Sequence, residues 1–284
     1  MPELPEVETI RRDLEPLVIG RSIVRVHVDP ETLPLLAGAG VDAGALRTTL
    51  VGRRIETLSR TGKYLLAGLS DGLTLVIHLR MTGRLVWRPA GAPPEQYERA
   101  RVSLDNGHDL RWSDLRKFGT WRLLADPAEL LGRLGPEPIA PGFSSALFRK
   151  AIAGARGPIK SVLLDQRRLA GIGNIYADEA LFTARVRPDT PADELAGGAV
   201  KRLAKACREV LLQGIANRGA SFSDYVDGKG EAGSQHMHVQ VFRRTGEPCY
   251  TCGSPVRRTV IGGRATHFCG RCQKSGKKRG GRGS

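Results

Sequence analysis

The chain has 284 residues, of which 40% are hydrophobic and 26% charged. These are ordinary values for a globular protein and exclude wholesale disorder, and the length suits two modest domains better than one. No apolar run reaches the about 18 residues of a transmembrane helix, the acidic and polar start predicts no secretory signal peptide, and aromatic residues at 5% are too few for a protein that mainly stacks bases.

Positive charge is concentrated in the second half of the chain. The formal net charge is +15. Residues 1–140 contain 19 Lys and Arg against 18 Asp and Glu, whereas residues 141–284 contain 25 against 11. From Cys249 onward there are 9 basic residues and no acidic one. This bias favours a polyanionic partner, with nucleic acid as the first candidate and an anionic membrane as the second.

The first half is predicted to form one early helix followed by an antiparallel sheet structure. Apolar residues recur at steps of three and four directly after Pro5, as expected of an amphipathic helix, at Val7, Ile10, Leu14 and Leu17. From about residue 22 to residue 86 short β-branched runs predict strands, and the clearest candidates are 23–28, 64–69, 73–79 and, further on, 121–124. Asp71-Gly72 is a hairpin signal between two of them.

The second half is predicted to be mainly helical. Three prolines and two glycines between Leu134 and Gly142 mark the best linker candidate. Helical patterns follow at 145–153, 159–166, 175–184 and 192–218. After Gly219 the sequence is polar and glycine-rich as far as Ser234, and a cysteine-bearing module then ends in a Lys/Arg/Gly/Ser tail that we expect to be disordered.

Four cysteines in the terminal module have the spacing of a zinc site. Cys249 and Cys252 form one Cys-x2-Cys pair, and Cys269 and Cys272 form a second after 16 residues. Such pairs place four thiolates around one tetrahedral Zn2+, and four Cys ligands leave no position for water, so the zinc would be structural. Two disulfides are the alternative, which a reducing compartment disfavours. The alternating stretch between the pairs breaks at Gly262-Gly263, which predicts a β-hairpin that presents Arg264.

A second motif, Gly171-Ile172-Gly173-Asn174, predicts a sharp turn between two helices with Asn174 at the N-cap of the second. Backbone N–H groups exposed at that helix start would bind a phosphate. A helix–turn–helix with a purely structural role is the alternative. Lys160 before the motif and the zinc hairpin after it favour binding of DNA phosphates.

The N-terminus is a third candidate site. Proline at position 2 is small enough to permit removal of the initiator methionine, which would leave Pro2 as a secondary amine directly before Glu3. An α-amine has a pKa of about 8, so roughly a tenth of it is neutral at pH 7. A neutral amine that attacks a sugar C1′ gives an iminium, an electron sink that can drive elimination, with Glu3 as the proton shuttle. A Pro-Glu terminus taken alone has no such role in most proteins.

These motifs occur in one order along the chain, together with Leu4-Pro5-Glu6-Val7-Glu8, Gly62-Lys63-Tyr64-Leu65 and Asp165-Gln166. In this combination the chain closely resembles the bacterial formamidopyrimidine-DNA glycosylase family, over essentially its whole length to Gln273. The resemblance implies an α+β multidomain fold: an N-terminal β-sandwich with an early helix, a helical helix–two-turn–helix domain and a C-terminal zinc ribbon. It also implies a bifunctional DNA glycosylase and AP lyase.

The resemblance carries roles to individual residues. It makes Pro2 the Schiff-base nucleophile, Glu3 the general acid/base and Lys63 the catalytic-site lysine, which contacts phosphate near the lesion. DNA-binding positions of the family match His78, Lys160, Asn174, Tyr176 and Arg264. Glu6 matches a position near the extruded base, and the glycine-rich stretch 219–233, with Ser221, Phe222 and Tyr225, matches the mobile lesion-capping loop.

The residues of the intercalation wedge distinguish two branches of the family. In the formamidopyrimidine branch a Met, an Arg and a Phe fill the gap left by the flipped nucleotide, and Met81, Arg116 and Phe118 match them. The endonuclease VIII branch, which acts on oxidised pyrimidines, lacks this set. Core packing is the alternative for Met81 and Phe118 taken alone. Exposed apolar wedges would stabilise an unstacked base step, whose opening costs about a few kcal/mol.

We therefore expect an enzyme that removes oxidised purines, chiefly 8-oxoguanine and formamidopyrimidines, from double-stranded DNA and then cuts the strand by β,δ-elimination at the abasic site. The expected protein is a bacterial cytoplasmic monomer associated with the nucleoid, with no membrane partner. An oxidised-pyrimidine glycosylase and a non-catalytic zinc-dependent DNA-binding protein remain as alternatives. The expected domains are the catalytic β-sandwich 1–134, a linker 135–143, the helix–two-turn–helix domain with the capping loop 144–235, the zinc-finger hairpin 236–273 and the basic tail 274–284.

Two features depart from the family pattern. Lys117 stands where many members have a second arginine, and the charge is kept. The chain also continues beyond Cys272 with five basic residues, where the family usually stops within a few positions. Such a tail is expected to add salt-sensitive, sequence-independent DNA affinity.

Overall fold

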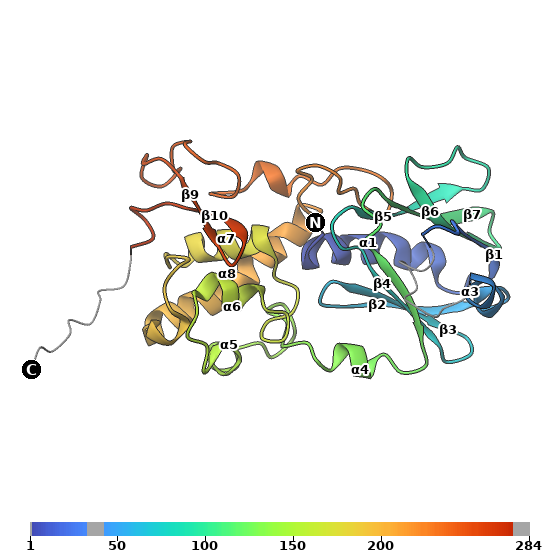
Figure 1. The fold of residues 1–284 in the computed structure, drawn as a ribbon, viewed down its shortest axis with the longest axis horizontal. Helices are drawn as coiled ribbons and strands as arrows, with labels where there is room; N and C mark the ends of the chain where they lie inside the picture. The colour runs from blue at the N-terminus through green and yellow to red at the C-terminus, as the bar shows by residue number, and fades with distance from the viewer. Residues whose placement is uncertain (1, 33–42, 275–284) are drawn as a thin grey trace, which may run out of the picture. The chain divides into compact units, whose positions relative to one another are not determined.

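The computed structural model describes residues 2–32 and 43–274 (Figure 1). The chain folds into two compact units: unit 1 comprises Met1–Arg133 and Gly214–Met237, and unit 2 comprises Leu134–Gln213 and His238–Ser284. The sequence grouped residues 144–235 together, whereas the fold places 214–237 in unit 1. Within the described ranges, no helix is both long enough and apolar enough to cross a lipid bilayer.

Unit 1 is a β-sandwich of two antiparallel four-stranded sheets. One sheet has the order β1-β6-β7-β5 and the other the order β2-β3-β4-β8. The elements of unit 1 in chain order are α1 (Leu4–Val18), β1 (Ile23–Val28), α3 (Ala43–Leu50), β2 (Ile55–Thr61), β3 (Tyr64–Leu69), β4 (Thr74–His78), β5 (Gly83–Pro89), β6 (Glu98–Leu104), β7 (His108–Asp114), β8 (Thr120–Leu124), α4 (Ala128–Leu131) and the short 3-10 helix η2 (Gln235–Met237).

The early helix is confirmed as α1. Pro5 lies in its first turn, where a missing N–H costs nothing, and Glu3 is its N-cap in a reciprocal capping box with Glu6. The apolar face of α1 is fully buried in the core that the two sheets share, through Val7, Ile10, Leu14 and Val18. This packing fixes the direction in which the first residues of the chain leave the sandwich.

Strands β6 and β7 were not predicted, because charged residues interrupt their apolar pattern. Arg111 on β7 is fully buried, and its guanidinium donates to Asp109 Oδ2 at 3.1 Å and to the carbonyl of Ala92 at 2.8 Å. An arginine in a hydropathy pattern indicates an exposed position, although these acceptors allow Arg111 to be buried. Helix α3 was also missed, in a region from which strands were expected.

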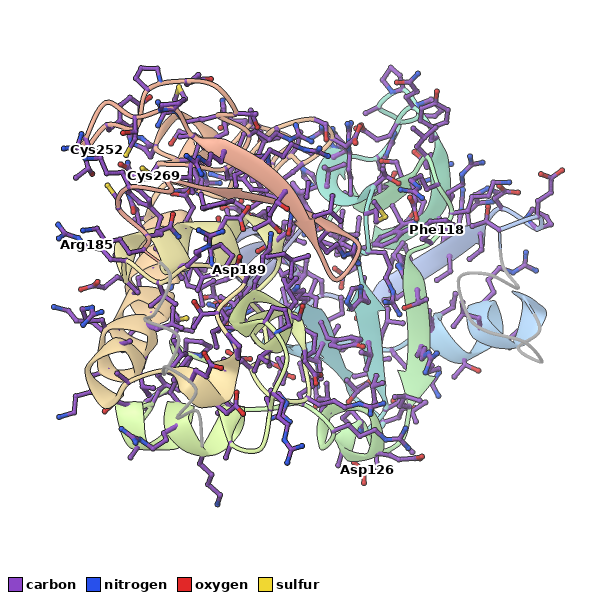
Figure 2. The ribbon with its side chains drawn as sticks, turned by 60° about the vertical axis from the view of Figure 1, so that its left-hand side comes forward. Phe118, Asp126, Arg185, Asp189, Cys252 and Cys269 are labelled. Atoms are coloured by element: carbon purple, nitrogen blue, oxygen red, sulfur yellow. The ribbon has the colours of Figure 1, made fainter. Side chains whose placement is uncertain are left out.

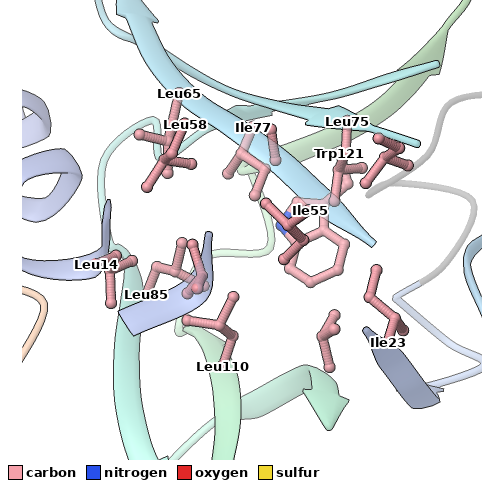
Figure 3. A pocket seen from close by; sticks show the side chains of 14 residues that line it. Leu14, Ile23, Ile55, Leu58, Leu65, Leu75, Ile77, Leu85, Leu110 and Trp121 are labelled. Carbon is pink, nitrogen blue, oxygen red and sulfur yellow. The ribbon is translucent and has the colours of Figure 1, made fainter. Parts of the chain in front are cut away.

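The core between the sheets contains a small cavity of about 30 Å³ (Figure 3). Its lining is entirely apolar and includes Leu65 on β3, Ile77 on β4 and Trp121 on β8. These three strands therefore turn alternate residues inward, and the residues between them face the outer side of the sheet.

Unit 2 consists of helices and the terminal hairpin. Its elements are α5 (Ser145–Ile152), α6 (Ile159–Leu164), α7 (Asn174–Thr183), the 3-10 helix η1 (Ala192–Glu194), α8 (Gly197–Ala216, which extends into unit 1), β9 (Arg257–Ile261) and β10 (Arg264–Phe268). The single helix predicted over 192–218 is divided, because Leu195 is extended between η1 and α8. Strands β9 and β10 pair antiparallel, and the two glycines between them have φ of +56° and +72°, so the predicted two-residue hairpin is confirmed.

Candidate functional site

The N-terminal residues are buried at the start of α1. Pro2 is buried, and the Glu3 side chain is 1% exposed. In the capping box the Glu3 carboxylate accepts the backbone N–H of Glu6, so it lies at the positive end of the α1 dipole. The expected removal of Met1 concerns a residue outside the described ranges. The structure thus places an acid beside Pro2 in surroundings that exclude bulk water.

Glu6, expected near the extruded base, is committed to backbone donors. Its Oε2 accepts the N–H of Glu3 at 2.8 Å, and its Oε1 accepts the N–H of Ala220, also at 2.8 Å. The side chain is 1% exposed. Glu6 therefore ties the start of α1 to the segment that begins the glycine-rich loop.

Lys63 lies in a turn that is held to α1 through Glu8. The Glu8 carboxylate accepts hydrogen bonds from Arg11, Arg12 and Arg60, the last at 3.1 Å, and Arg60 in turn donates to the carbonyl of Gly62 at 2.9 Å. Burial alone would raise the pKa of Glu8, but these guanidinium partners lower it to about 2. Lys63, in the next position, is 7% exposed.

Sequence reasoning missed this function of Glu8. The signal was present, because Glu8, Arg11 and Arg12 have the i, i+3 and i, i+4 spacing of helix ion pairs. The contribution of Arg60 could not be found in the same way, because it depends on the packing of β2 against α1 across 52 positions of sequence.

His78 is neutral and has a defined tautomer. Burial first, and then the positive charges of Arg80 and Lys63, lower its pKa to about 3. Its Nδ1 accepts the backbone N–H of Arg80 at 3.0 Å, so the proton of the neutral ring is on Nε2. The ring also packs edge-on against Tyr64, with centroids 4.6 Å apart. His78 can therefore offer one N–H donor without a charge.

The three expected wedge residues lie together. Arg116 Nη1 donates to Met81 Sδ at 3.0 Å, and its guanidinium carbon lies 4.5 Å from the centre of the Phe118 ring. Phe118 is 50% exposed and lies near the start of β8 in Figure 2, so core packing does not explain it. An aromatic ring stacked on a guanidinium at the surface is a flat group that can replace a base.

Asp114 holds the two wedge loops in position. Its buried carboxylate accepts Thr82 Oγ1 at 2.5 Å and the backbone N–H groups of Arg116 and Gly119 at 3.2 and 2.8 Å. A side chain at position 119 would collide with Trp112, because an added Cβ would lie 2.1 Å from its ring. The two wedge loops are therefore held by the Asp114 carboxylate and by the close contact of Gly119 with the Trp112 ring.

The segment expected to be the lesion-capping loop is closed by its own hydrogen bonds. Ser221 Oγ donates to the carbonyl of Tyr225 at 2.8 Å and accepts the N–H of Gly233 at 3.0 Å. Tyr225 is 7% exposed and belongs to the sandwich core. The fully buried carboxylate of Asp227 pairs with Arg218. In this structure Ser221 therefore closes the loop by hydrogen bonds within it, and Tyr225 packs the loop against the sandwich core.

Three of the four expected DNA-binding residues of unit 2 meet at the β9–β10 hairpin. Lys160 Nζ donates to the carbonyl of Ala265 at 2.9 Å, and Asn174 Nδ2 donates to the same carbonyl at 3.0 Å. Lys160 and Tyr176 are fully buried, whereas Arg264 at the start of β10 is exposed. The structure thus brings Lys160 and Asn174 to the turn end of the hairpin, next to Arg264.

The expected N-cap was wrong by one position. Gly173 is the N-cap of α7, and Asn174 is the first helical residue, with its amide turned to Ala265. The tertiary hydrogen bond outweighs the local preference of Asn for the cap, and Gly171, with a φ of +93°, makes the turn before the helix.

Two adjacent carboxylates on α7 hold different parts of the terminal module, Asp178 the hairpin and Glu179 the segment before it, and neither was predicted from the sequence. Asp178 lies 2.7 Å from Lys160 Nζ and accepts the backbone N–H of His267 at 2.9 Å. Glu179 accepts three consecutive backbone N–H groups, from Gln240, Val241 and Phe242, at 2.7 to 3.0 Å. Buried carboxylates with this number of donors determine where the neighbouring chain lies.

The four cysteines fit one zinc ion. The Sγ atoms of Cys249, Cys252, Cys269 and Cys272 all lie within 4.8 Å of one another. The pairs Cys249–Cys272 and Cys252–Cys269 are separated by 3.9 and 3.5 Å, close to the about 3.8 Å edge of a tetrahedron with Zn–S bonds of about 2.3 Å. Figure 2 shows Cys252 and Cys269 side by side at the base of the hairpin. The ribbon thus has the donor set and geometry of a closed structural zinc site.

Comparison with known proteins covers nearly the whole chain. Family models match the formamidopyrimidine-DNA glycosylase N-terminal domain at residues 1–121, the formamidopyrimidine-DNA glycosylase H2TH domain at 134–225, and the zinc finger found in FPG and IleRS at 246–274. A formamidopyrimidine-DNA glycosylase of Heliobacterium modesticaldum is 47% identical over 281 residues, which cover 96% of this chain and all of that protein.

Two solved structures extend the likeness to three dimensions. The Lactococcus lactis Fpg in complex with an abasic-site DNA has a TM-score of 0.87 and 33% identity, and the match covers 96% of this chain and 100% of that one. A MutM complex with carbocyclic 8-oxo-G DNA gives a TM-score of 0.87, 34% identity and the same coverage.

A β-sandwich with a buried N-terminal acid, a helix–two-turn–helix unit and a zinc ribbon define a zinc-containing DNA glycosylase of base-excision repair. Within that class, this chain belongs to the formamidopyrimidine-DNA glycosylase family. The expected fold and the expected single structural zinc are thereby confirmed.

Proposed function

We propose that this chain excises oxidised purines, 8-oxoguanine and formamidopyrimidines, from duplex DNA and then cleaves the strand through a Schiff base at Pro2. The observation that carries the proposal is the buried Glu3 carboxylate directly after Pro2, on the same unit as the Met81, Arg116 and Phe118 cluster. The relatives' complexes with abasic-site and 8-oxo-G DNA support the same substrate class.

The chemistry begins with the neutral secondary amine of Pro2. Its nitrogen attacks C1′ of the flipped nucleotide, the glycosidic bond breaks, and the base leaves with a proton. Glu3 then donates a proton to O4′, which opens the sugar ring and gives the iminium. Loss of a C2′ proton breaks the C3′–O3′ bond, a second elimination breaks the C5′–O5′ bond, and water releases Pro2.

Lys63 and His78 hold the phosphates on either side of the reacting sugar. Lys63 supplies a charge, and His78 supplies an uncharged Nε2–H donor that stays in the same state at all pH values well above about 3. The wedge occupies the space left in the duplex, and Phe118 stacks on the neighbouring base. Zinc is structural, and no step passes through it. The enzyme acts as a monomer in the bacterial cytoplasm, on nucleoid DNA.

Borohydride trapping tests this proposal. We expect a covalent protein–DNA adduct with a duplex that contains 8-oxoguanine opposite cytosine, and a much weaker one with thymine glycol. Glu3→Gln should abolish base excision while DNA binding is kept. A preference for thymine glycol would instead support the oxidised-pyrimidine branch, and binding to DNA with no adduct on any lesion would support a non-catalytic protein.

A further inference from the structure

The outer face of the sheet β2-β3-β4-β8 carries a row of polar side chains beside His78. In the register of this sheet Tyr64 pairs with His78 and His78 with Thr120, and in the next row Val76 pairs with Arg122. Paired residues share a face, so these side chains lie opposite to Leu65, Ile77 and Trp121, which Figure 3 shows on the inner face.

These side chains line a surface pocket of about 100 Å³. Its lining consists of the polar residues Tyr64, Thr120, Arg80 and Arg122 and the apolar residues Val76 and Leu130, the latter from α4. The volume corresponds to about three water molecules, which is suited to one small oxyanion and too small for a base or a nucleoside.

The polar groups of the pocket have no partners within the described ranges. Neither guanidinium, of Arg80 or of Arg122, forms a hydrogen bond or an ion pair there, and the hydroxyl groups of Tyr64 and Thr120 form no hydrogen bond there. No carboxylate lines the pocket. In contrast, Arg11, Arg53, Arg60, Arg88 and Arg99 of the same unit all pair with acids.

Two unpaired guanidinium groups and two hydroxyl groups around one small pocket match a phosphate group. A guanidinium presents N–H donors in a fixed planar fork that fits phosphate oxygens, and hydroxyl groups donate to the remaining ones. A carboxylate ligand would use only two oxygens and leave donors unsatisfied.

We propose that this pocket binds a phosphate group, as a DNA-backbone contact beyond those assigned to Lys63 and His78. The assignment to DNA rests on the proposed function. The main-chain N–H of Arg80 donates to His78, and Met81 of the wedge is the next residue, so a phosphate on Arg80 adjoins both. Arg80 also has a φ of +55°, which sets the direction of its side chain.

The salt dependence of DNA binding tests the pocket. Each neutralised phosphate contributes about 0.9 to the slope of log K against log salt, so Arg122→Glu should reduce the slope by about 1. Arg25→Glu is the matched control, because Arg25 is exposed on β1 in the other sheet and also pairs with no acid within the described ranges. Tyr64→Phe combined with Thr120→Val should weaken binding with a smaller change of slope.

A second arm identifies the source of the phosphate. Inorganic phosphate is titrated into the DNA-free protein while the NMR signal of the Arg122 side chain is followed. A slope change specific to Arg122→Glu assigns the pocket to the DNA backbone. A saturable NMR shift without a slope change assigns it to free phosphate, and equal slopes for Arg122→Glu and Arg25→Glu with no NMR shift overturn it. If wild-type protein is not trapped on damaged DNA, the proposed function fails instead.

Discussion

Glu8→Gln is the sharpest test of how the fold positions the Lys63 turn. The change keeps the shape of the side chain but removes the charge that three guanidinium groups share. Arg60 suffers most, because its side chain is only 7% exposed and Glu8 is its carboxylate partner at 3.1 Å. Leaving a buried cation without its counter-ion lowers the free energy of unfolding by more than the intact ion pair adds to it.

The size of the effect follows from the pKa of Glu8. Its fall from the ordinary value of 4.5 to about 2 corresponds to about 3 kcal/mol of stability at neutral pH. Arg12 is 58% exposed, so solvent screens part of this, and we expect Glu8→Gln to lower the free energy of unfolding by about 2 kcal/mol at pH 7. Because the folded pKa is depressed, the contribution is complete above pH 4.5 and lost as the pH falls toward 2, with about 60% gone at pH 3.

Urea unfolding of both proteins from pH 7 to pH 3 measures this. The difference between them isolates Glu8, since His78, whose pKa burial lowers to about 3, destabilises both proteins equally in acid. The stability gap should narrow as the pH falls below 4.5. A gap that stays constant with pH would refute the electrostatic account, and no gap at pH 7 would show that Arg60 finds another partner.

Three further predictions concern other parts of the chain. Asp178→Asn leaves the fully buried Lys160 ammonium without its carboxylate and should lower the free energy of unfolding in urea by about 3–5 kcal/mol. The control Asp189→Asn (Asp189 is labelled in Figure 2) should lower it by less than about 1 kcal/mol, because the pair of Asp189 with Arg187 is at the surface, and equal losses would contradict the role of Asp178 as a buried anchor. Zinc removal by a chelator should abolish the hydrogen-exchange protection of β9 and β10 and weaken DNA binding, whereas retained protection would mean that the hairpin folds without metal. Phe118→Ala removes an aromatic ring whose stacking on a base contributes about 1–3 kcal/mol, so it should slow excision of 8-oxoguanine about tenfold or more. Covalent trapping on a preformed abasic site should decrease little, and an equal decrease of activity on both substrates would refute a wedge role.

Local signals predicted the parts of the fold that depend on local sequence. The period of α1, the Gly262-Gly263 turn and the paired cysteines are each decided within a few residues, and the structure confirms them. Strand β7 could not be predicted, because Arg111 can be buried only where Asp109 and carbonyl groups of a distant loop accept its hydrogen bonds. That arrangement is visible only in the folded chain.

The site shows the same division. The wedge residues were predicted from the resemblance to the family, and their mutual contacts agree with the prediction of one wedge. The anchors Asp178 and Glu179 were not found, because each accepts hydrogen bonds from distant segments. Glu8 has two local partners that were visible in the sequence, but its link to Arg60 is equally distant. Lys160 was expected to contact a DNA phosphate, and in this structure the ion pair with Asp178 and the hydrogen bond to the hairpin carbonyl of Ala265 keep its ammonium buried.

The identity of the residue that attacks C1′ is the central claim. It is tested by borohydride trapping of the full chain on an 8-oxoguanine duplex, followed by proteolysis and mass spectrometry of the adduct. We expect that Met1 is absent and that the reduced sugar remnant is on the nitrogen of Pro2. An adduct on Lys63 or on another lysine, or trapping by a protein that retains Met1, would contradict it.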